Sequence, residues 1–340
     1  MKYLLIQLYQ IGDVILTTHI PREIKKFDKN AEIDFLTFPM NVPVLKYNPN
    51  IREVLTISRD SGLKGMITTI SKIRNKHYDA ILDFHNNPRS AYITFLSGAK
   101  YKTGFANSPR RFFYNTKVNN MGGCPGREKL SLISPFEKNF VMSSHNARPE
   151  IFISNESSAR IDSILKGLGI TENDFFITMS PTHKRETRRW KLRHFMDTAR
   201  YLVDQHNAKI MLTYGPGEKQ YLDDVVNNLP DNIFIMPEMN LEDFITLVSK
   251  AKFHFGNDSA PHHIATSFTI PTFVIVGSTS CNVVFESHEH SYAQMGLPCQ
   301  PCHQKQCRLS PLVTCMEELT FEMIKPKLED FLNREVFERQ

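Results

Sequence analysis

The chain has 340 residues, 41% of them hydrophobic, and can bury two cores, because single domains usually contain about 100–200 residues. Its net charge of +5 is mild and accompanies no basic run interleaved with aromatic residues, which argues against a nucleic-acid partner. No apolar run approaches the roughly 18 residues of a membrane span, and the opening run Met1–Leu8 is too short for a signal peptide. We therefore expect a soluble, cytoplasmic, two-domain enzyme.

Apolar periodicity predicts alternating strands and helices in the first half of the chain. The expected strands are Tyr3–Leu8, Glu32–Phe38, Glu53–Ile57 and Tyr78–Phe84, and the expected helices are Asp13–Phe27 and Leu63–Lys76. Strands that alternate with helices are typical of a parallel sheet. A less regular stretch follows over residues 101–127, and segment 147–153 is the expected linker.

A second series of the same kind follows this linker. The expected strands are Phe175–Met179, Lys209–Leu212, Ile233–Ile235, Lys252–Phe255 and Thr272–Val276, and the expected helices are Glu156–Leu168, Lys191–His206, Gly217–Leu229, Leu241–Ser249, Ser259–Phe268 and Thr320–Arg334. Each half is Rossmann-like, although neither has the Gly-x-Gly-x-x-Gly turn of dinucleotide-binding proteins. The predicted domains are 1–152 and 153–319, followed by a closing helical segment, 320–340.

The turn after the first strand contains a candidate catalytic carboxylate. Gly12 permits a tight turn, and Asp13 stands at the expected start of a helix. Asp13 can cap this helix, or it can serve as a base at the carboxyl edge of the sheet. The two roles compete, because a helix N-terminus stabilises a carboxylate and weakens it as a base.

The densest basic segment of the chain lies between a predicted strand and a predicted helix, at residues 179–190. Its four positive side chains and two threonine hydroxyls can hold a diphosphate without a metal, because guanidinium groups bind phosphate bidentately. A solvated basic loop is the alternative, but the position at the ligand edge of a sheet favours the site. In the next strand-to-helix loop, Glu218 can accept hydrogen bonds from a ribose.

A second candidate ligand turn, residues 256–259, follows the apolar run Ala251–Phe255. Its composition is that of a tight turn ending at a helix N-cap, and the helix carries two histidines. Another apolar strand then ends at Gly277. Two strand ends and one helix N-terminus should therefore converge, which is where anionic ligands such as nucleotide diphosphates bind in open α/β sheets.

Four of the six cysteines are clustered near the end of the chain, with the spacing Cys299-x2-Cys302-x4-Cys307-x7-Cys315. A reducing compartment disfavours stable disulfides, so the cluster indicates reduced thiols or a structural zinc ion more than disulfide bonds.

Taken in order, these segments resemble the ADP-heptose:lipopolysaccharide heptosyltransferases of glycosyltransferase family 9. The resemblance covers most of the chain and is carried by segments 11–14, 83–91, 98–100, 180–190 and 258–263. It implies an α/β fold of the GT-B class, in which two Rossmann-like domains with parallel sheets face each other across a cleft. It also implies that the helix in 320–340 packs back toward the first domain.

By this resemblance, the protein is an inverting, metal-independent glycosyltransferase that moves a heptose from ADP-heptose to a lipopolysaccharide core acceptor, with Asp13 as the base. No catalytic cofactor is implied, and no Asp-x-Asp arrangement is present to hold a divalent ion. With the basic loop and Glu218, the expected donor-binding set is Thr182, Lys184, Arg188, Glu218, Asp258, Ser259 and His263.

The acceptor, an anionic lipid-linked saccharide, is expected to bind the first domain. Candidate contacts are Arg89, Arg110, Arg111 and Lys117, for which a solvated basic face is the alternative. Such an acceptor implies a peripheral location at the inner face of the cytoplasmic membrane. Three other functions stay open: a family 9 transferase with another donor, a nucleotide-sugar epimerase, and a non-catalytic nucleotide-sugar-binding protein, against which an intact Asp13 argues.

Overall fold

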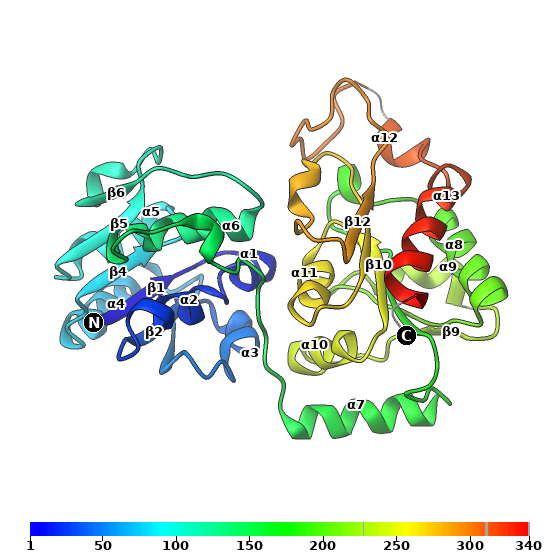
Figure 1. The fold of residues 1–340 in the computed structure, drawn as a ribbon, viewed down its shortest axis with the longest axis horizontal. Coiled ribbons are helices and arrows are strands. Elements are labelled where there is room, and N and C mark those ends of the chain that lie inside the picture. The colour runs from blue at the N-terminus through cyan, green and yellow to red at the C-terminus, as the bar shows by residue number, and fades with distance from the viewer. Residues whose placement is uncertain (227, 310–311, 339–340) are drawn as a thin grey trace. The chain divides into compact units, whose positions relative to one another are not determined.

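The computed structural model describes residues 1–226, 228–309 and 312–338. The chain divides into two compact units, Met1–Phe152 and Ile153–Gln340, and each contains one six-stranded sheet (Figure 1). Every pair of neighbouring strands in both sheets is parallel. The predicted α/β class with two Rossmann-like parallel sheets is therefore confirmed, whereas the cleft between the two sheets stays a prediction.

The first sheet has the order β3-β2-β1-β4-β5-β6. Its strands are β1 (Lys2–Ile6), β2 (Glu32–Thr37), β3 (Glu53–Thr56), β4 (Ala80–Asp83), β5 (Tyr101–Phe105) and β6 (Thr116–Val118). The first four lie where the periodicity predicts them. Strands β5 and β6 fall in the stretch that the sequence indicated to be irregular, because they are short and their side chains are mixed polar and apolar.

The helices of the first unit are α1 (Ile11–Ile15), α2 (Ile20–Phe27), α3 (Val42–Leu45), α4 (Gly62–Asn75), α5 (Pro88–Leu96) and α6 (Pro125–Leu130). The prediction of one helix over Asp13–Phe27 is wrong, because the helix ends at Ile15 and a new one begins at Ile20. Pro21 occupies the first turn of α2, where its missing N–H costs nothing.

The second sheet has the order β12-β11-β10-β7-β8-β9. Its strands are β7 (Phe176–Ser180), β8 (Lys209–Leu212), β9 (Ile233–Ile235), β10 (Phe253–Asn257), β11 (Thr272–Ile275) and β12 (His290–Ala293). The sequence predicted the first five and missed β12. Its helices are α7 (Asn155–Gly167), α8 (Leu192–His206), α9 (Asp223–Val226), α10 (Leu241–Ser249), α11 (Ala260–Ser267), α12 (Thr314–Glu317) and α13 (Phe321–Leu332).

The closing helix α13 is part of the core of the second unit. It lies against α8, and its buried side chains join a cluster with those of the central strands β10 and β11. Phe331, for example, packs against the rings of Phe253 and Phe273 at centroid distances of 6.2 and 6.0 Å. Packing of α13 toward the first domain stays a prediction.

Candidate active site

The order of the second sheet reverses between β7 and β10, and Asn257 holds the segments that meet there. Asn257 is fully buried at the end of β10. Its Oδ1 accepts a hydrogen bond from the backbone N–H of Trp190 (2.9 Å), and its Nδ2 donates to the carbonyl of Pro181 (2.9 Å). One amide side chain thus fixes both ends of the basic loop at the reversal point, where ligands bind in open α/β sheets.

Beside Asn257, Arg188 and Asp258 form an ion pair. Arg188 lies in a short 3₁₀ helix, Glu186–Arg188, and its Nη1 is 3.3 Å from Oδ2 of the buried Asp258. The same carboxylate oxygen accepts a hydrogen bond from the hydroxyl of Thr279 (2.7 Å). Among the described residues, the buried Nε of Arg188 has no hydrogen-bond partner. A fixed guanidinium with an unused donor is suited to bind an anion.

Helix α11 begins next to this ion pair. Ser259 is its N-cap residue, as predicted, and the Ser259 hydroxyl donates to the carbonyl of Asn257 at 3.3 Å. His263 lies one turn into the helix, and burial lowers its pKa despite the opposing effect of the Asp258 carboxylate. The imidazole is therefore neutral near pH 7, with one ring nitrogen able to donate and the other able to accept a hydrogen bond.

A pocket of about 460 Å³ lies beside the basic loop. Its lining residues come from the basic loop and from the loop after β8: Thr182, His183, Lys184, Arg189, Pro216, Gly217, Glu218, Gln220 and Tyr221. Burial, and then the charge of Arg188, lowers the pKa of His183, while Asp258 and Glu218 raise it. The His183 imidazole lines the pocket and is close enough to Arg188 and Asp258 for their charges to change its pKa.

The pocket brings together three of the predicted donor residues, Thr182, Lys184 and Glu218. The Glu218 carboxylate accepts a hydrogen bond from the backbone N–H of Gly215 (3.3 Å), which fixes the turn at the mouth of the pocket. The sequence did not single out Arg189, although its guanidinium lies 4.7 Å above the ring of Tyr221 and lines the same space. A planar cation on an aromatic ring is a surface on which a nucleobase can stack.

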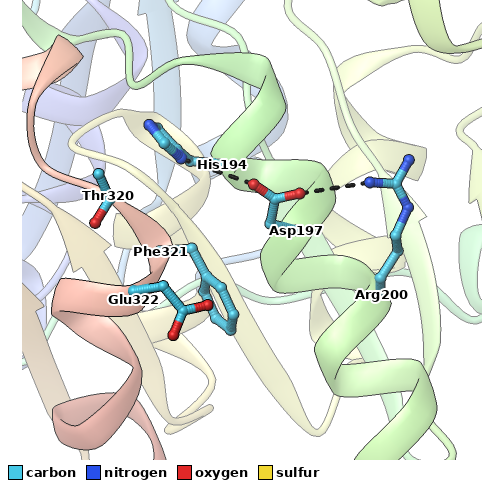
Figure 2. Close-up of a pocket in the computed structure, with 6 residues that line it drawn as sticks. All are labelled: His194, Asp197, Arg200, Thr320, Phe321 and Glu322. Carbon is cyan, nitrogen blue, oxygen red and sulfur yellow. Dashed lines mark hydrogen bonds and ion pairs between the residues drawn. The ribbon is translucent and has the colours of Figure 1, made fainter.

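A second pocket, of about 360 Å³, lies between α8 and the start of α13 (Figure 2). Asp197 pairs with His194 at 3.8 Å and with Arg200 at 3.4 Å, as the dashed lines in Figure 2 show. Glu322 adds another carboxylate to the lining. The Arg200 cation is already paired, and two carboxylates repel a diphosphate, so this pocket does not suit the predicted donor.

In the first sheet the strand order reverses between β1 and β4, and Asp13 lies just beyond β1. Gln10 is the N-cap of α1, so the prediction that Asp13 caps the helix is wrong: Asp13 is the third residue of the first turn. Its backbone carbonyl accepts a hydrogen bond from the Thr17 hydroxyl (2.8 Å). This position leaves its carboxylate at the carboxyl edge of the sheet.

Lys129 of α6 is a second charged group at this edge, which the sequence missed. Burial lowers its pKa, whereas the carboxylates of Asp13, Glu128 and Asp83 oppose that effect. The amine is therefore within electrostatic reach of Asp13. Helix α6 lies along the end of α1: a Cβ at Gly126 would be 3.8 Å from the Leu16 side chain.

Asp83 ends β4 and is fully buried. Its Oδ1 accepts hydrogen bonds from the backbone N–H groups of His85 (3.0 Å) and Asn86 (2.9 Å), and its Oδ2 accepts one from the Tyr114 hydroxyl (2.7 Å). Burial raises the pKa of Asp83, while these hydrogen bonds oppose the change. Asp83 thus fixes the loop after β4. Because it is buried, it does not contribute a charge to the exposed carboxyl edge of the sheet.

The predicted acceptor residues make hydrogen bonds to different segments of the first unit. Arg110 donates to the carbonyl of Asn86 (3.1 Å) in the loop after β4, so it lies at the carboxyl edge of the sheet. Arg89 instead donates to the carbonyl of Ser58 (3.1 Å), which ties α5 to the segment before α4. Arg111 and Lys117 are exposed. Acceptor binding by these residues stays a prediction.

All six cysteines are free thiols. Burial raises the pKa of Cys315 to about 11, with smaller contributions from the thiols of Cys299, Cys302 and Cys307. The four are therefore neighbours, but no group of three or more His, Cys, Asp or Glu side chains within the described ranges is arranged to hold a metal ion. The segment supports the donor loop, since the Thr187 hydroxyl donates to the carbonyl of Gln304 at 2.8 Å.

Comparison with known proteins gives a consistent result. A lipopolysaccharide heptosyltransferase 1 of Campylobacter coli is 24% identical over 294 residues, which cover 82% of this chain and 84% of the relative. The solved structure of a family 9 glycosyl transferase from Veillonella parvula superposes with a TM-score of 0.83 at 18% identity, covering 98% of this chain and 97% of the other. E. coli ADP-heptose lps heptosyltransferase II superposes with a TM-score of 0.76 at 17% identity over 98% and 99%.

These likenesses confirm the GT-B fold class. No helix in the part of the chain that the structure describes is long and apolar enough to cross a membrane. The model of "Glycosyltransferase family 9 (heptosyltransferase)" matches residues 66–313. With a parallel sheet in each unit, a candidate base after β1 and a cationic site after β7, the chain belongs to glycosyltransferase family 9.

Proposed function

We propose that this glycosyltransferase moves a heptose from ADP-heptose to an anionic, lipid-linked lipopolysaccharide core saccharide. The first domain, 1–152, binds the acceptor, and the second, 153–319, binds the donor. The observation that carries the proposal is the half-buried Arg188 at the reversal point of the second sheet, with a buried and unused Nε, beside Asp258 and the start of α11. The names of two relatives support the sugar: both are heptosyltransferases, and one is named for ADP-heptose.

The transfer is a single displacement that inverts the anomeric carbon. Asp13 accepts the proton of an acceptor hydroxyl while that oxygen forms its bond to the anomeric carbon. The bond from this carbon to the phosphate oxygen breaks at the same time, and its electron pair leaves with ADP. Since the oxygen attacks opposite the leaving group, the configuration inverts.

The cationic groups of the second domain stabilise the departing ADP. Arg188 and Lys184 bind the diphosphate, and the first-turn N–H groups of α11 add their positive dipole. Thr182, Ser259 and His263 supply hydrogen bonds, Glu218 binds the ribose, and Asp258 holds Arg188 in place. Stabilising a developing anion with fixed charges is usually the largest catalytic term.

No divalent metal or other cofactor enters this mechanism, because the fixed cations neutralise the diphosphate. A structural zinc ion on Cys299, Cys302, Cys307 and Cys315 is the alternative that their spacing raises, and it would lie outside the chemistry. Arg89, Arg110 and Arg111 contact the anionic acceptor, and the protein works as a peripheral enzyme at the inner membrane face.

The test is Asp13→Asn, with Asp28→Asn as the matched control at the end of α2. We expect turnover of ADP-heptose with a lipopolysaccharide core acceptor to fall by roughly two to four orders of magnitude, the range for loss of a general base. Mass spectrometry of the glycosylated acceptor measures turnover, and calorimetric titration with ADP should show unchanged affinity. Near wild-type turnover in Asp13→Asn would remove Asp13 from the mechanism.

A further inference from the structure

Helices α4 and α5, with the 3₁₀ turn Arg111–Phe113, form one continuous face of the first unit. Arg74 of α4 donates to the carbonyl of Leu96 in α5 (3.3 Å), and Arg89 of α5 donates to that of Ser58 in the segment before α4 (3.1 Å). Their inner sides are buried in the core below the sheet. We call the outer side the α4–α5 face.

The α4–α5 face exposes large apolar side chains. The exposed fractions are 68% for Leu63, 58% for Ile67, 45% for Tyr92, 47% for Phe95, 40% for Leu96 and 76% for Phe112. The ring of Phe113 packs against Tyr92 and Phe95 at centroid distances of 4.9 and 5.5 Å, which joins the turn to α5. Apolar side chains gathered on adjacent elements mark an interaction surface, unlike single exposed ones.

The same face carries more cations than anions, although Lys72 in α4 and Lys76 at its end pair with Glu53 of β3. Segments 61–78 and 84–127 contain no Asp or Glu, although they carry many Lys and Arg residues. Of the two acids between these segments, Asp83 is fully buried, and Asp79 precedes β4 at the opposite edge of the sheet. Cations lie among the apolar groups: Lys102 Nζ is 5.8 Å from the Phe95 ring centre, and the Arg111 guanidinium is 5.4 Å from that of Phe112.

We propose that the α4–α5 face docks on an anionic lipid bilayer. The apolar side chains enter the headgroup region, and the Lys and Arg side chains contact lipid phosphates. Aromatic and aliphatic side chains mixed with cations are typical of interfacial membrane binding, which combines buried apolar area with attraction to anionic lipids. A second copy of this face would bring like charges together. The inference rests on the proposed function in one respect, that the acceptor is lipid-linked.

The test is co-sedimentation of the full chain with vesicles, without donor or acceptor. Vesicles of phosphatidylglycerol and phosphatidylethanolamine provide the anionic surface, and phosphatidylcholine vesicles provide the neutral one. We expect binding to the anionic vesicles that weakens as salt screens the charges, and at least tenfold weaker binding to the neutral ones. Equal binding to both, or none to the anionic vesicles, would overturn the proposal.

Two double variants test the two components of the face. Lys64→Glu with Lys102→Glu should weaken binding by about 25-fold or more, because each Lys near an anionic surface contributes roughly fivefold. Ile67→Ser with Phe95→Ser should weaken it at least tenfold, because exposed apolar area drives insertion.

Matched controls carry the same chemical changes elsewhere. Lys29→Glu with Lys166→Glu has the same net charge as the charge variant. Val141→Ser with Met323→Ser removes two apolar side chains that are each 54% exposed. The controls should bind like the wild type, and equal losses in variants and controls would overturn the proposal.

Two further measurements separate the possible failures. Glycosylation of a lipid-free core saccharide should be unchanged in both double variants. A wild-type chain that binds anionic vesicles but does not glycosylate this saccharide would count against the proposed function and not against docking. Sedimentation velocity checks for a second copy. A dimer that the double variants dissociate, without vesicle binding, would overturn the proposal in favour of self-association.

Discussion

Arg188 and Asp258 form an ion pair at the point where the second sheet reverses its strand order, with Nη1 and Oδ2 3.3 Å apart. The Thr279 hydroxyl donates a hydrogen bond to the same Asp258 oxygen at 2.7 Å. The ion pair holds the Arg188 guanidinium where the donor diphosphate is proposed to bind. It thereby limits the other conformations that this side chain can adopt. The affinity of the second domain for ADP should therefore depend strongly on Arg188.

The first prediction concerns Arg188→Ala. The dissociation constant for ADP should rise by about 10- to 150-fold, because a hydrogen bond to a charged group contributes roughly 1.5–3 kcal/mol. Isothermal titration calorimetry measures the change. Arg200→Ala is the matched control, because Arg200 lines the pocket of Figure 2 and pairs with Asp197. An Arg188→Ala protein that binds ADP as the control does would place the diphosphate elsewhere.

The second prediction concerns Asn257, which organises the donor site without facing the donor. Asn257→Ala leaves the buried Trp190 N–H and the Pro181 carbonyl without their partner, which should cost about 2–4 kcal/mol of stability. The basic loop should loosen, and ADP affinity should fall at temperatures where the protein is still folded.

The fluorescence of Trp190 reports this loosening directly, because Trp190 is the sole tryptophan and is fully buried. Its emission should shift to longer wavelength in Asn257→Ala and stay unchanged in a control such as Asn155→Ala at the exposed start of α7. An unshifted spectrum with reduced ADP affinity would mean that Asn257 acts by direct contact with the ligand.

The fold was predictable wherever a strand is a continuous apolar run. Lys209–Leu212 and Ile233–Ile235 have the same bounds in the sequence prediction and in the structure, whereas β12, with the sequence His-Ser-Tyr-Ala, gives no such signal. The loops with Arg188 and Asp258 each follow a predicted strand. Because neighbouring parallel strands have their carboxyl ends at the same edge of a sheet, the sequence indicated that these two loops meet. Lys129 could not be found this way: it approaches Asp13 through tertiary packing of a short helix in a stretch without clear periodicity.

The third prediction concerns the four clustered cysteines. Because all six cysteines are free in the structure, we expect these four to be reduced thiols. Protein purified without a His-tag should contain less than about 0.2 zinc per chain, and thiol titration in denaturant should find all four. Near-stoichiometric zinc would instead establish a structural metal site. In either case Cys302→Ser should lower thermal stability before it lowers turnover, since the cysteine segment reaches the donor loop through the Thr187–Gln304 hydrogen bond.

The last prediction concerns acid stability and His254. Burial lowers the pKa of His254 to about 3, and its Nδ1 shares a hydrogen bond with the Thr178 hydroxyl at 3.0 Å. Between about pH 6.5 and pH 3, the unfolded chain binds a proton at this residue and the folded chain does not. Protonation therefore favours the unfolded state, so the stability is fully present above about pH 6.5 and falls as the pH drops toward 3.

The measurement is urea unfolding of the second domain, followed by Trp190 fluorescence between pH 7 and pH 5. The free energy of unfolding should fall with a slope that includes about 1.4 kcal/mol per pH unit from His254. His254→Gln should be less stable at pH 7, because the amide fits the site less well, but its slope should be smaller by about that amount below pH 6. A His254→Gln slope equal to that of the wild type would mean that the buried imidazole takes up its proton in the folded state.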